Sequence, residues 1–555
     1  MKDQTSPLTT EAINEAAATT IEDVTTTPSA APTKLLSEDA TSANIESDED
    51  SGYLNASDNS LSADDVATCE TSIKSRSSEE ETKQQQQHND KQPSDDSSGS
   101  NSNDEENSAV SSSSWRLDVP SKVETMSDDK LVEMLKSLGE EFEKLPEQVD
   151  RRKWAKSRVA ELFGETLTQP LLDVAAGHLI DGDSGISMDQ RPDWLDPDKF
   201  RRGQIFARDF QFGISYAELI SLFMVFSFEE GLKPLIMTSQ SGTPFTAFKR
   251  YLSTGCRVQS WYTSDPWTKG TQAYRDMKAV RMMHAAVRKR IEATTIPEYE
   301  AKTRIDDAWC PTLNVIRRDF QSTCPAPAPG QCPYMIVSKY PELRGKKLSQ
   351  GEMASTQFAF VGLVVLNPKF FGIHASDEDL EAFCHTWRGI GYLLGIEDEF
   401  NYCRGTLADV KQRTMDFIEY WVKPNFRQIT PECEHMMRCV VEGLQYYFPG
   451  STYETCILDL ASVLNLHMPR LYNSLSYQAW IRHNVIRMYF NFWSRFSGMR
   501  TMMNNQLNRS IEKARKFDDE KLNSLKIKSD KLLESYRNKL QQNREANDID
   551  QIQVE

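Results

Sequence analysis

From residue 127 onward, apolar residues recur three and four positions apart, the spacing that places them on one face of an α-helix. Segments 151–165, 380–396 and 407–422 all show it. Ser127 with acidic residues directly after it predicts that the first helix begins near residue 126. No series of alternating strands with hairpin turns appears, and no repeat of fixed period. We therefore predict an all-α fold.

The N-terminal part differs sharply in charge from the rest of the chain. Residues 1–110 contain 24 Asp and Glu against 6 Lys and Arg, and Tyr53 is their only aromatic residue. So few apolar residues predict a disordered acidic tail, which either solubilises the protein or offers serines beside acids for phosphorylation. Subtracting it from the totals, 64−6 and 82−24, leaves 58 basic and 58 acidic residues. The folded part therefore offers no bulk charge for binding nucleic acid.

The N-terminus and the cysteines indicate a reducing compartment. No basic start followed by an apolar run marks a secretory signal, so we expect a cytoplasmic protein. The ten cysteines form no CxxC pair, which is typical of reduced thiols. Cys324 and Cys332 flank a Pro-rich stretch, and either a disulfide or a flexible surface loop accounts for them.

Three segments leave open whether they contact a membrane or another chain. Residues 210–228 are nearly long enough to cross a bilayer, but Glu218 interrupts them and favours a buried core helix. In residues 480–500 arginines alternate with aromatic residues, as in a helix on the face of an intracellular membrane or a packed helix. The highly charged segment 504–555 is either a coiled coil or a solvated helix.

One histidine lies between two arginines in "AVRMMHAAVRKR", residues 279–290. On a helix Arg281, His284 and Arg288 project from the same face. Small neighbours leave room for a planar group, so His284 is a candidate ligand of haem iron, with the arginines beside the two propionates. The alternative is a hydrogen-bonded core histidine with both arginines in salt bridges.

A second pair of polar residues lies upstream, in "FKRYLSTG". Arg250 and Thr254 are four positions apart and face one way, so they could donate hydrogen bonds to reduced oxygen, or Arg250 could anchor a loop. Between the two stretches, residues 258–276, with Trp261, Pro266 and Trp267, indicate a turn and approach loop. Residues 181–203 indicate another loop, before the core helix.

Together these stretches resemble the catalytic domain of the latex clearing protein (rubber oxygenase) family, which also occurs in the endoplasmic-reticulum-bound oxygenase of mycophenolic acid biosynthesis. "RYLST" precedes "AVRMMHAAVRKR" by about thirty residues, as in that family. "STQFAFVGLVVLNPKFFGI" and "DEDLEAFCHTWRGIGYLLGIEDEF" resemble its later blocks in the same order. The resemblance covers roughly residues 190–430.

The resemblance implies a globin-like helical core that holds haem b and uses O2 to cleave carbon–carbon double bonds of isoprenoids or other unsaturated lipids. His284 matches the axial ligand, Arg281 and Arg288 the flanking arginines, and Arg250 and Thr254 the distal pair. Trp387 and Arg388 match the later block, with a packing and ion-pairing role. The sequence thus divides into a tail (1–115), N-terminal helices (116–189), the oxygenase-like domain (190–430), further helices (431–503) and a charged helix (504–555).

Two parts of this interpretation stay open. The family's distal base has no clear counterpart here, and the candidates are Glu218, Glu229 and Glu230. The core helix offers Leu219, Leu222, Phe223, Phe226 and Phe228 as walls of an apolar substrate channel.

Two rival functions follow from the sequence. A di-iron carboxylate protein needs Glu-x-x-His on two helices, and only Glu432 to His435 matches. A haem-free helical scaffold of the same fold, acting as a membrane-associated interaction protein, is the other alternative.

Overall fold

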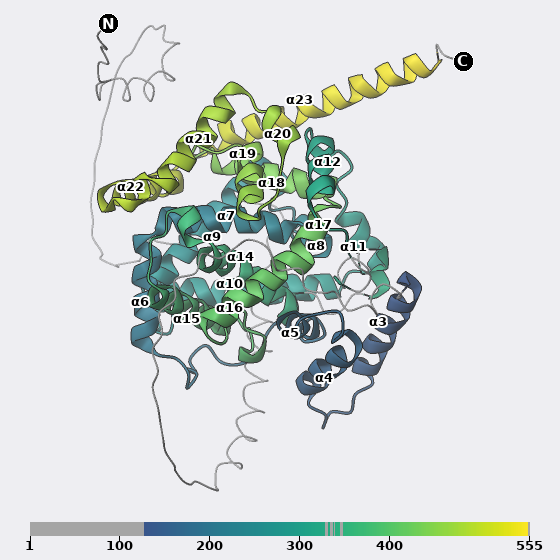
Figure 1. Ribbon diagram of the computed structural model, residues 1–555, viewed down its shortest axis with the longest axis vertical. Helices are drawn as coiled ribbons and strands as arrows, with labels where there is room; N and C mark the ends of the chain where they lie inside the picture. The colour runs from purple at the N-terminus through teal and green to yellow at the C-terminus, as the bar shows by residue number, and fades with distance from the viewer. Residues whose placement is uncertain (1–126, 328–330, 333–336, 338, 344–347, 553–555) are drawn as a thin grey trace, which may run out of the picture. The chain divides into compact units, whose positions relative to one another are not determined.

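The computed structural model describes residues 127–555, except 328–330, 333–336, 338, 344–347 and 553–555 (Figure 1). They belong to one unit of the chain, Leu61–Glu555. Every regular element in these ranges is helical, which confirms the predicted all-α class. The predicted tail, 1–115, lies outside the described residues.

The first helices follow from capping residues in the sequence. Ser127 accepts a hydrogen bond from the amide of Lys130, and the first helix begins at the next residue, as predicted. The N-terminal helices are α3 (Asp128–Glu143), α4 (Arg151–Phe163) and α5 (Gln169–Gly177).

The remaining elements fall into a central group and a C-terminal group. The central elements are α6 (Pro197–Asp209), α7 (Gln211–Phe226), α8 (Glu229–Met237), α9 (Pro244–Thr263), α10 (Gln272–Glu292), α11 (Ile296–Lys302), α12 (Leu313–Thr323), η2 (Pro341–Leu343), α14 (Gln350–Leu366), η3 (Pro368–Phe371), α15 (Asp377–Leu393), η4 (Asp398–Phe400), α16 (Leu407–Asp416), the π-helical turn η5 (Phe417–Val422) and α17 (Lys423–Phe426). The C-terminal elements are α18 (Pro431–Leu444), α19 (Tyr453–Val463), α20 (Pro469–Asn473), α21 (Tyr477–Asn491), η6 (Trp493–Arg495), α22 (Ser497–Arg515) and α23 (Asp519–Ile552).

Four helix pairs form the centre of the unit. α7 packs along α14, α6 along α15, and α9 along both α10 and α18. α7 and α14 are mostly apolar around their whole circumference, and most of their side chains are buried, which is typical of helices inside a core. This arrangement agrees with the core-helix interpretation of residues 210–228.

Two predicted loop boundaries are wrong. The loop predicted over 181–203 ends at Asp196, whose side chain caps α6 while Pro197 occupies its first turn. The predicted turn of residues 258–276 is shorter, because α9 continues to Thr263 and α10 begins at Gln272. Trp261 therefore belongs to a helix.

No single described helix is long and apolar enough to span a membrane. α6 and α7 together meet the length and composition criteria, but the chain bends by 89° between them.

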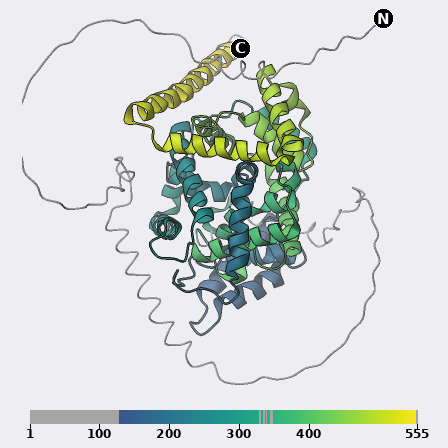
Figure 2. The same cartoon turned by 90° about the vertical axis from the view of Figure 1, so that its left-hand side faces the viewer.

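The C-terminal helix α23 turns away from α22 after a short break (Figure 2). Its buried residues Leu525 and Leu533 pack on the body of the protein, and Ser529 accepts a hydrogen bond from the amide of Phe245 in α9. Leu532 of the same helix is exposed. Near its beginning this helix is thus packed within its own chain.

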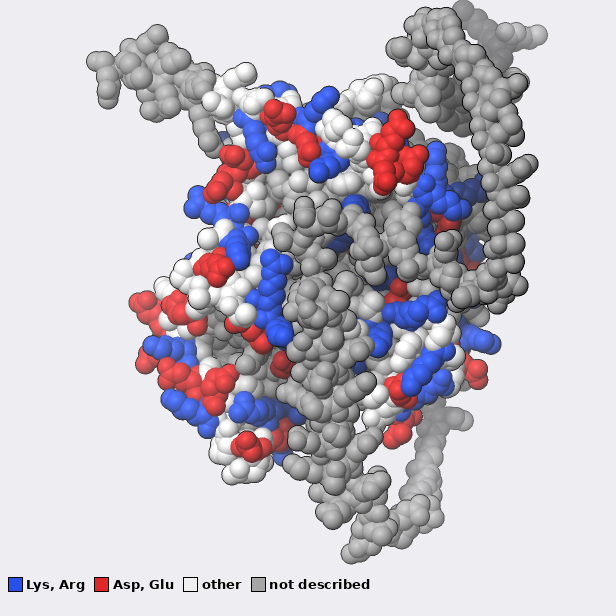
Figure 3. Space-filling model, turned by 180° about the vertical axis from the view of Figure 1, so that it is seen from behind, with Lys and Arg blue, Asp and Glu red and all other residues white. Residues whose placement is uncertain are grey.

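Cysteine and charge patterns agree with the sequence in the described residues. All nine cysteines described are free thiols, Cys324 and Cys332 among them, and Cys69 lies outside the described residues. Lys, Arg, Asp and Glu side chains are interspersed over the face in Figure 3, as the balanced charge of this part of the chain requires.

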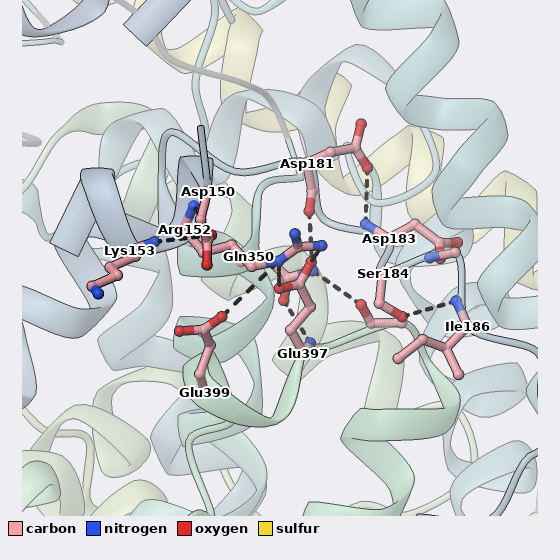
Figure 4. A network of polar contacts seen from close by, with 12 residues as sticks. Asp150, Arg152, Lys153, Asp181, Asp183, Ser184, Ile186, Gln350, Glu397 and Glu399 are labelled. Carbon is pink, nitrogen blue, oxygen red and sulfur yellow. Dashed lines mark hydrogen bonds and ion pairs between the residues drawn. The ribbon is translucent and has the colours of Figure 1, made fainter. Parts of the chain in front are cut away.

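A polar network holds residues 178–196, which connect α5 to α6, against the body of the protein (Figure 4). We call these residues the connection before α6. Gln350, fully buried at the start of α14, donates to the carbonyls of Asp181 and Gly395, both at 3.0 Å, and accepts from the amide of Glu397 at 2.9 Å. The Glu397 carboxylate in turn binds Arg152 of α4. One amide side chain therefore links three separate segments.

We predict that Gln350→Ala lowers the free energy of unfolding by about 2–4 kcal/mol, because three buried backbone groups lose their partners. Urea unfolding followed by circular dichroism measures it. The exposed Gln478→Ala is the control and should change stability by less than about 0.5 kcal/mol. Equal stability of both variants would contradict the role assigned to this network.

Candidate functional site around His284

The antiparallel hairpin of α9 and α10 brings Arg250 and His284 to the same level. Arg250 lies 13 residues before the end of α9, and His284 lies 12 residues after the start of α10. At 1.5 Å per residue both are roughly 20 Å from the turn. Thr243 and Thr271 cap the two helices and so fix where each begins. The sequence stretches that were singled out separately therefore meet in the fold.

The imidazole of His284 is deep in the protein but is not hydrogen-bonded through Nδ1. That atom is buried and has no partner among the described residues. The side chain nevertheless keeps an intermediate exposed fraction. Buried polar atoms are normally paired, so this nitrogen calls for an explanation such as an unbound ligand.

His284 is neutral near pH 7. Burial first, and then the positive charges of Arg288 and Arg250, together lower its pKa to about 4, while Asp183 opposes them. A neutral imidazole keeps the lone pair that metal binding requires.

The two arginines flanking His284 are bound to the connection before α6. Arg281, which is buried, donates to both carboxylate oxygens of Asp183 and, at 2.8 Å, to the carbonyl of Ile186. Burial works against the Asp183 carboxylate, but the hydrogen bond and charge of Arg281 outweigh it and hold its pKa below the usual value. Arg288 donates to the carbonyl of Leu348 at 3.2 Å and lies 3.7 Å from Asp181.

The environment of His284 thus combines features of both interpretations of the sequence, a haem ligand and a core histidine. The arginines form the salt bridges expected around a core histidine, whereas the imidazole lacks the hydrogen bond at Nδ1 expected of one. The Nε atom of Arg288 is also buried without a partner among the described residues. That donor is free for an anionic group.

Arg250 and Thr254 project from α9 with few protein partners. Arg250 donates to the hydroxyl of Ser241 at 3.2 Å, and no carboxylate of the described residues lies within ion-pair distance of it. Both residues keep intermediate exposure. A cation without a carboxylate partner is available for negative charge that develops on a bound molecule.

Helix α10 has few helical packing partners. Among the described elements, α10 packs closely along α9 alone, while α7 packs along α14. Leu219 and Leu222 of α7 keep partial exposure. Phe223 and Phe226 are buried, and Phe223 stacks on Tyr453 with ring centroids 6.0 Å apart. Of the proposed channel walls, Leu219 and Leu222 remain candidates, whereas Phe223, Phe226 and also Phe228 pack in the core.

The three candidate bases have different surroundings. Glu230 and Glu229 lie 2.6 and 3.8 Å from the amine of Lys233. Glu218 has a buried oxygen without a partner among the described residues, and burial raises its pKa to about 8. It lies near Tyr262, whose pKa its charge raises in addition to the effect of burial. Glu218 is therefore the carboxyl poised to exchange a proton near neutral pH.

Trp387 and Arg388 have the contacts of structural residues. The indole of Trp387 donates to the hydroxyl of Tyr262 at 3.0 Å and stacks on Phe360 with centroids 4.4 Å apart. Arg388 forms two 2.7 Å bonds to Asp398. These contacts agree with the packing and ion-pairing role expected of both residues.

The histidine of the Glu432 to His435 motif, which was considered for a di-iron site, is hydrogen-bonded within the fold. His435 accepts from the amide of Trp309 at 2.8 Å, and its other nitrogen lies 2.9 Å from the carbonyl of Gly242. Glu432, the acid of the motif, lies in the first turn of α18. In the described ranges, no group of three or more His, Cys, Asp or Glu side chains is arranged to hold a metal ion. A porphyrin supplies four ligands itself, so a haem site needs only an axial residue such as His284.

Sequence reasoning missed Asp181, Asp183 and Ser241. Asp183 lies 98 positions before its partner Arg281, and no local pattern pairs residues so far apart. The only signal was the pair of acids in "DGD", which was interpreted as part of a loop.

Comparison with known proteins gives one distant structural neighbour. The structure of latex clearing protein in the closed state matches with a TM-score of 0.39 and 15% sequence identity, over 64% of this chain and 88% of that chain. This is a distant fold relationship and says nothing about the site. No protein-family model matches the chain, and no curated protein matches it.

We predict that Glu218→Gln reduces the dependence of stability on pH. The folded protein keeps a proton on Glu218 up to about pH 8, whereas the unfolded chain loses it near 4.5, so stability falls as pH rises through this interval. The variant should gain about 2–4 kcal/mol over wild type between about pH 5 and 8.

Urea unfolding at several pH values measures this difference. Exposed Glu147→Gln is the control and should follow the wild-type curve. If Glu218→Gln follows it as well, the carboxyl at position 218 is not protonated in the folded protein.

Proposed function

We propose that this protein is a haem b-dependent oxygenase that uses O2 to oxidise or cleave a carbon–carbon double bond of an isoprenoid or another unsaturated lipid. The observation that carries the proposal is the neutral imidazole of His284, whose buried Nδ1 has no hydrogen-bond partner among the described residues, on a helix that packs along the helix of Arg250. The motifs around both residues resemble those of the rubber oxygenase family, and the hairpin supports the pairing because it places them level with one another.

Three residues would hold the cofactor. His284 would bind iron, and Arg281 and Arg288 would face the propionates. Arg288 suits this role better, because its Nε hydrogen is unused, whereas Arg281 would share its charge with Asp183. When bound, haem supplies the electron-transfer and O2 chemistry that amino-acid side chains lack.

The chain's own residues then act by charge, proton transfer and exclusion of water. Arg250 and Thr254 donate hydrogen bonds to negative charge that develops on dioxygen, and such donors contribute most where water is absent. Glu218 holds or releases a proton at its carboxyl, with a pKa of about 8 close to the working pH. Leu219 and Leu222 provide apolar surface for an unsaturated chain.

A haem-free scaffold of the same fold is the second candidate. The ion pairs of Arg281 with Asp183 and of Arg288 with Asp181 favour it, because they occupy both arginines without a cofactor. The absorption spectrum separates the two functions, since only the oxygenase binds haem.

We predict that the purified protein reconstituted with haemin shows a Soret band, and that His284→Ala weakens or shifts it. His435→Ala is the matched control, because both ring nitrogens of this buried histidine bond to backbone groups. It should keep the spectrum but lose about 1–3 kcal/mol of stability, since the amide of Trp309 is left unpaired.

Two results would count against the assignment. Wild-type protein without a Soret band after reconstitution would eliminate the haem function. An unchanged band in His284→Ala would eliminate this histidine as the ligand.

We predict that the reconstituted protein consumes oxygen with squalene and that Arg250→Ala lowers kcat/KM about a hundredfold while the Soret band stays. Arg257→Ala on the same helix is the control, because Arg257 bonds to Ser253 and lies near Asp276. Oxygen-electrode traces measure both. Equal rates in the two variants would remove Arg250 from the reaction.

A further inference from the structure

Exposed apolar side chains gather on the C-terminal helices. Nine of the fourteen large apolar side chains that are exposed in the described part of the chain lie between residues 472 and 502. They are Tyr472, Tyr477, Trp480, Ile481, Val485, Met488, Phe492, Phe496 and Met502, which we call the α21–α22 face. Apolar patches of this kind on a folded protein mark a surface that contacts a partner or a membrane.

Two opposite stripes of α21 are apolar. One stripe packs inward through Phe490, which is fully buried and stacks on Phe212 with centroids 5.6 Å apart. The other consists of Tyr477, Ile481 and Val485, spaced four residues apart, and continues to Met488 and Phe492, all exposed. A helix that is apolar all round is normally covered on all sides. In this structure the second stripe faces outward.

The aromatic residues at the beginning of this face are held in place. The rings of Tyr477 and Trp480 stack with centroids 6.1 Å apart, and the indole of Trp480 donates to the hydroxyl of Tyr472 at 2.7 Å. Tyrosine and tryptophan are enriched at membrane–water interfaces, because one end of each side chain is apolar and the other polar.

The charge of this segment is opposite to that of the chain. Residues 460–511 contain no Asp or Glu and carry six arginines, in a protein with a net charge of −18. Arg482, Arg495 and Arg509 are exposed. Within the described residues, no carboxylate lies within ion-pair distance of these three. Their positive charge is therefore available to an anionic partner.

We propose that the α21–α22 face docks on the surface of an anionic lipid bilayer. Apolar and aromatic side chains enter the headgroup region, and the arginines around them bind lipid phosphates and carboxylates. Without the six arginines of this segment, residues 111–555 have 52 basic (58−6) and 58 acidic residues, so their weak negative charge disfavours contact of other faces with an anionic bilayer.

A second copy of the chain fits this face less well. A symmetric dimer would oppose the same face from each protomer, which brings arginines against arginines with no acid in the segment to pair them. The inference does not depend on the proposed oxygenase function.

Co-sedimentation of the full-length protein with vesicles tests the proposal. We expect binding to phosphatidylcholine vesicles that contain about one third phosphatidylserine, and at least about tenfold weaker binding to pure phosphatidylcholine. About 0.5 M NaCl should weaken binding to the anionic vesicles, because it screens the arginines.

Variants separate the apolar from the charged contribution. Phe492→Glu combined with Phe496→Glu, both more than half exposed, should reduce binding about tenfold or more. Arg482→Glu with Arg495→Glu should remove the preference for anionic vesicles. The matched control is Ile205→Glu with Ile296→Glu, which are similarly exposed on α6 and α11 and should bind as wild type.

Circular dichroism melting and size-exclusion chromatography show whether each variant stays folded. The proposal is overturned if wild-type protein remains in the supernatant with anionic vesicles at low salt, whether it is monomeric or dimeric. It is also overturned if the control pair loses binding to the same extent as the Phe492 and Phe496 pair.

Discussion

The ion pair between Arg281 and Asp183 is the interaction on which the candidate site depends. It binds the connection before α6 to α10 one turn away from His284, and Gln350 and Glu397 hold the same connection from the other side. A buried pair of this kind tolerates the loss of one partner poorly, because the remaining charge is stranded. The connection before α6 is therefore held firmly against α10. The imidazole of His284 lies on α10 and takes no part in this hydrogen-bond network.

The charges around the connection before α6 also determine the protonation state of the imidazole. Arg288 and Arg250 add to the effect of burial and keep His284 neutral, with a pKa of about 4. Glu218 shows the reverse effect, since burial raises its pKa to about 8. Titratable groups whose pKa values are shifted in opposite directions are typical of sites that exchange protons and ligands. Ion-pair networks also produce such pKa shifts.

Local sequence patterns predicted the helices well, but they did not predict which side chains contact one another. Apolar spacing placed α4 and α16 correctly, because their buried apolar residues recur three and four positions apart. The boundary at Asp196 was missed although the Asp-Pro pair is a capping signature. The pairing of Arg281 with Asp183 joins residues 98 positions apart, which no spacing in the sequence reveals. The ion pairs of Glu229 and Glu230 with Lys233 lie within α8 at helical spacing, so the sequence contained that signal.

The central claim is that the imidazole of His284 binds the iron of a haem. A crystal structure of the protein grown with haemin tests it most directly. The account predicts a porphyrin between the helices with its iron bonded to a ring nitrogen of His284 and Arg288 close to a propionate. A structure in which haemin is absent, or is bound through a different histidine while His284 stays packed among its neighbours, would contradict it.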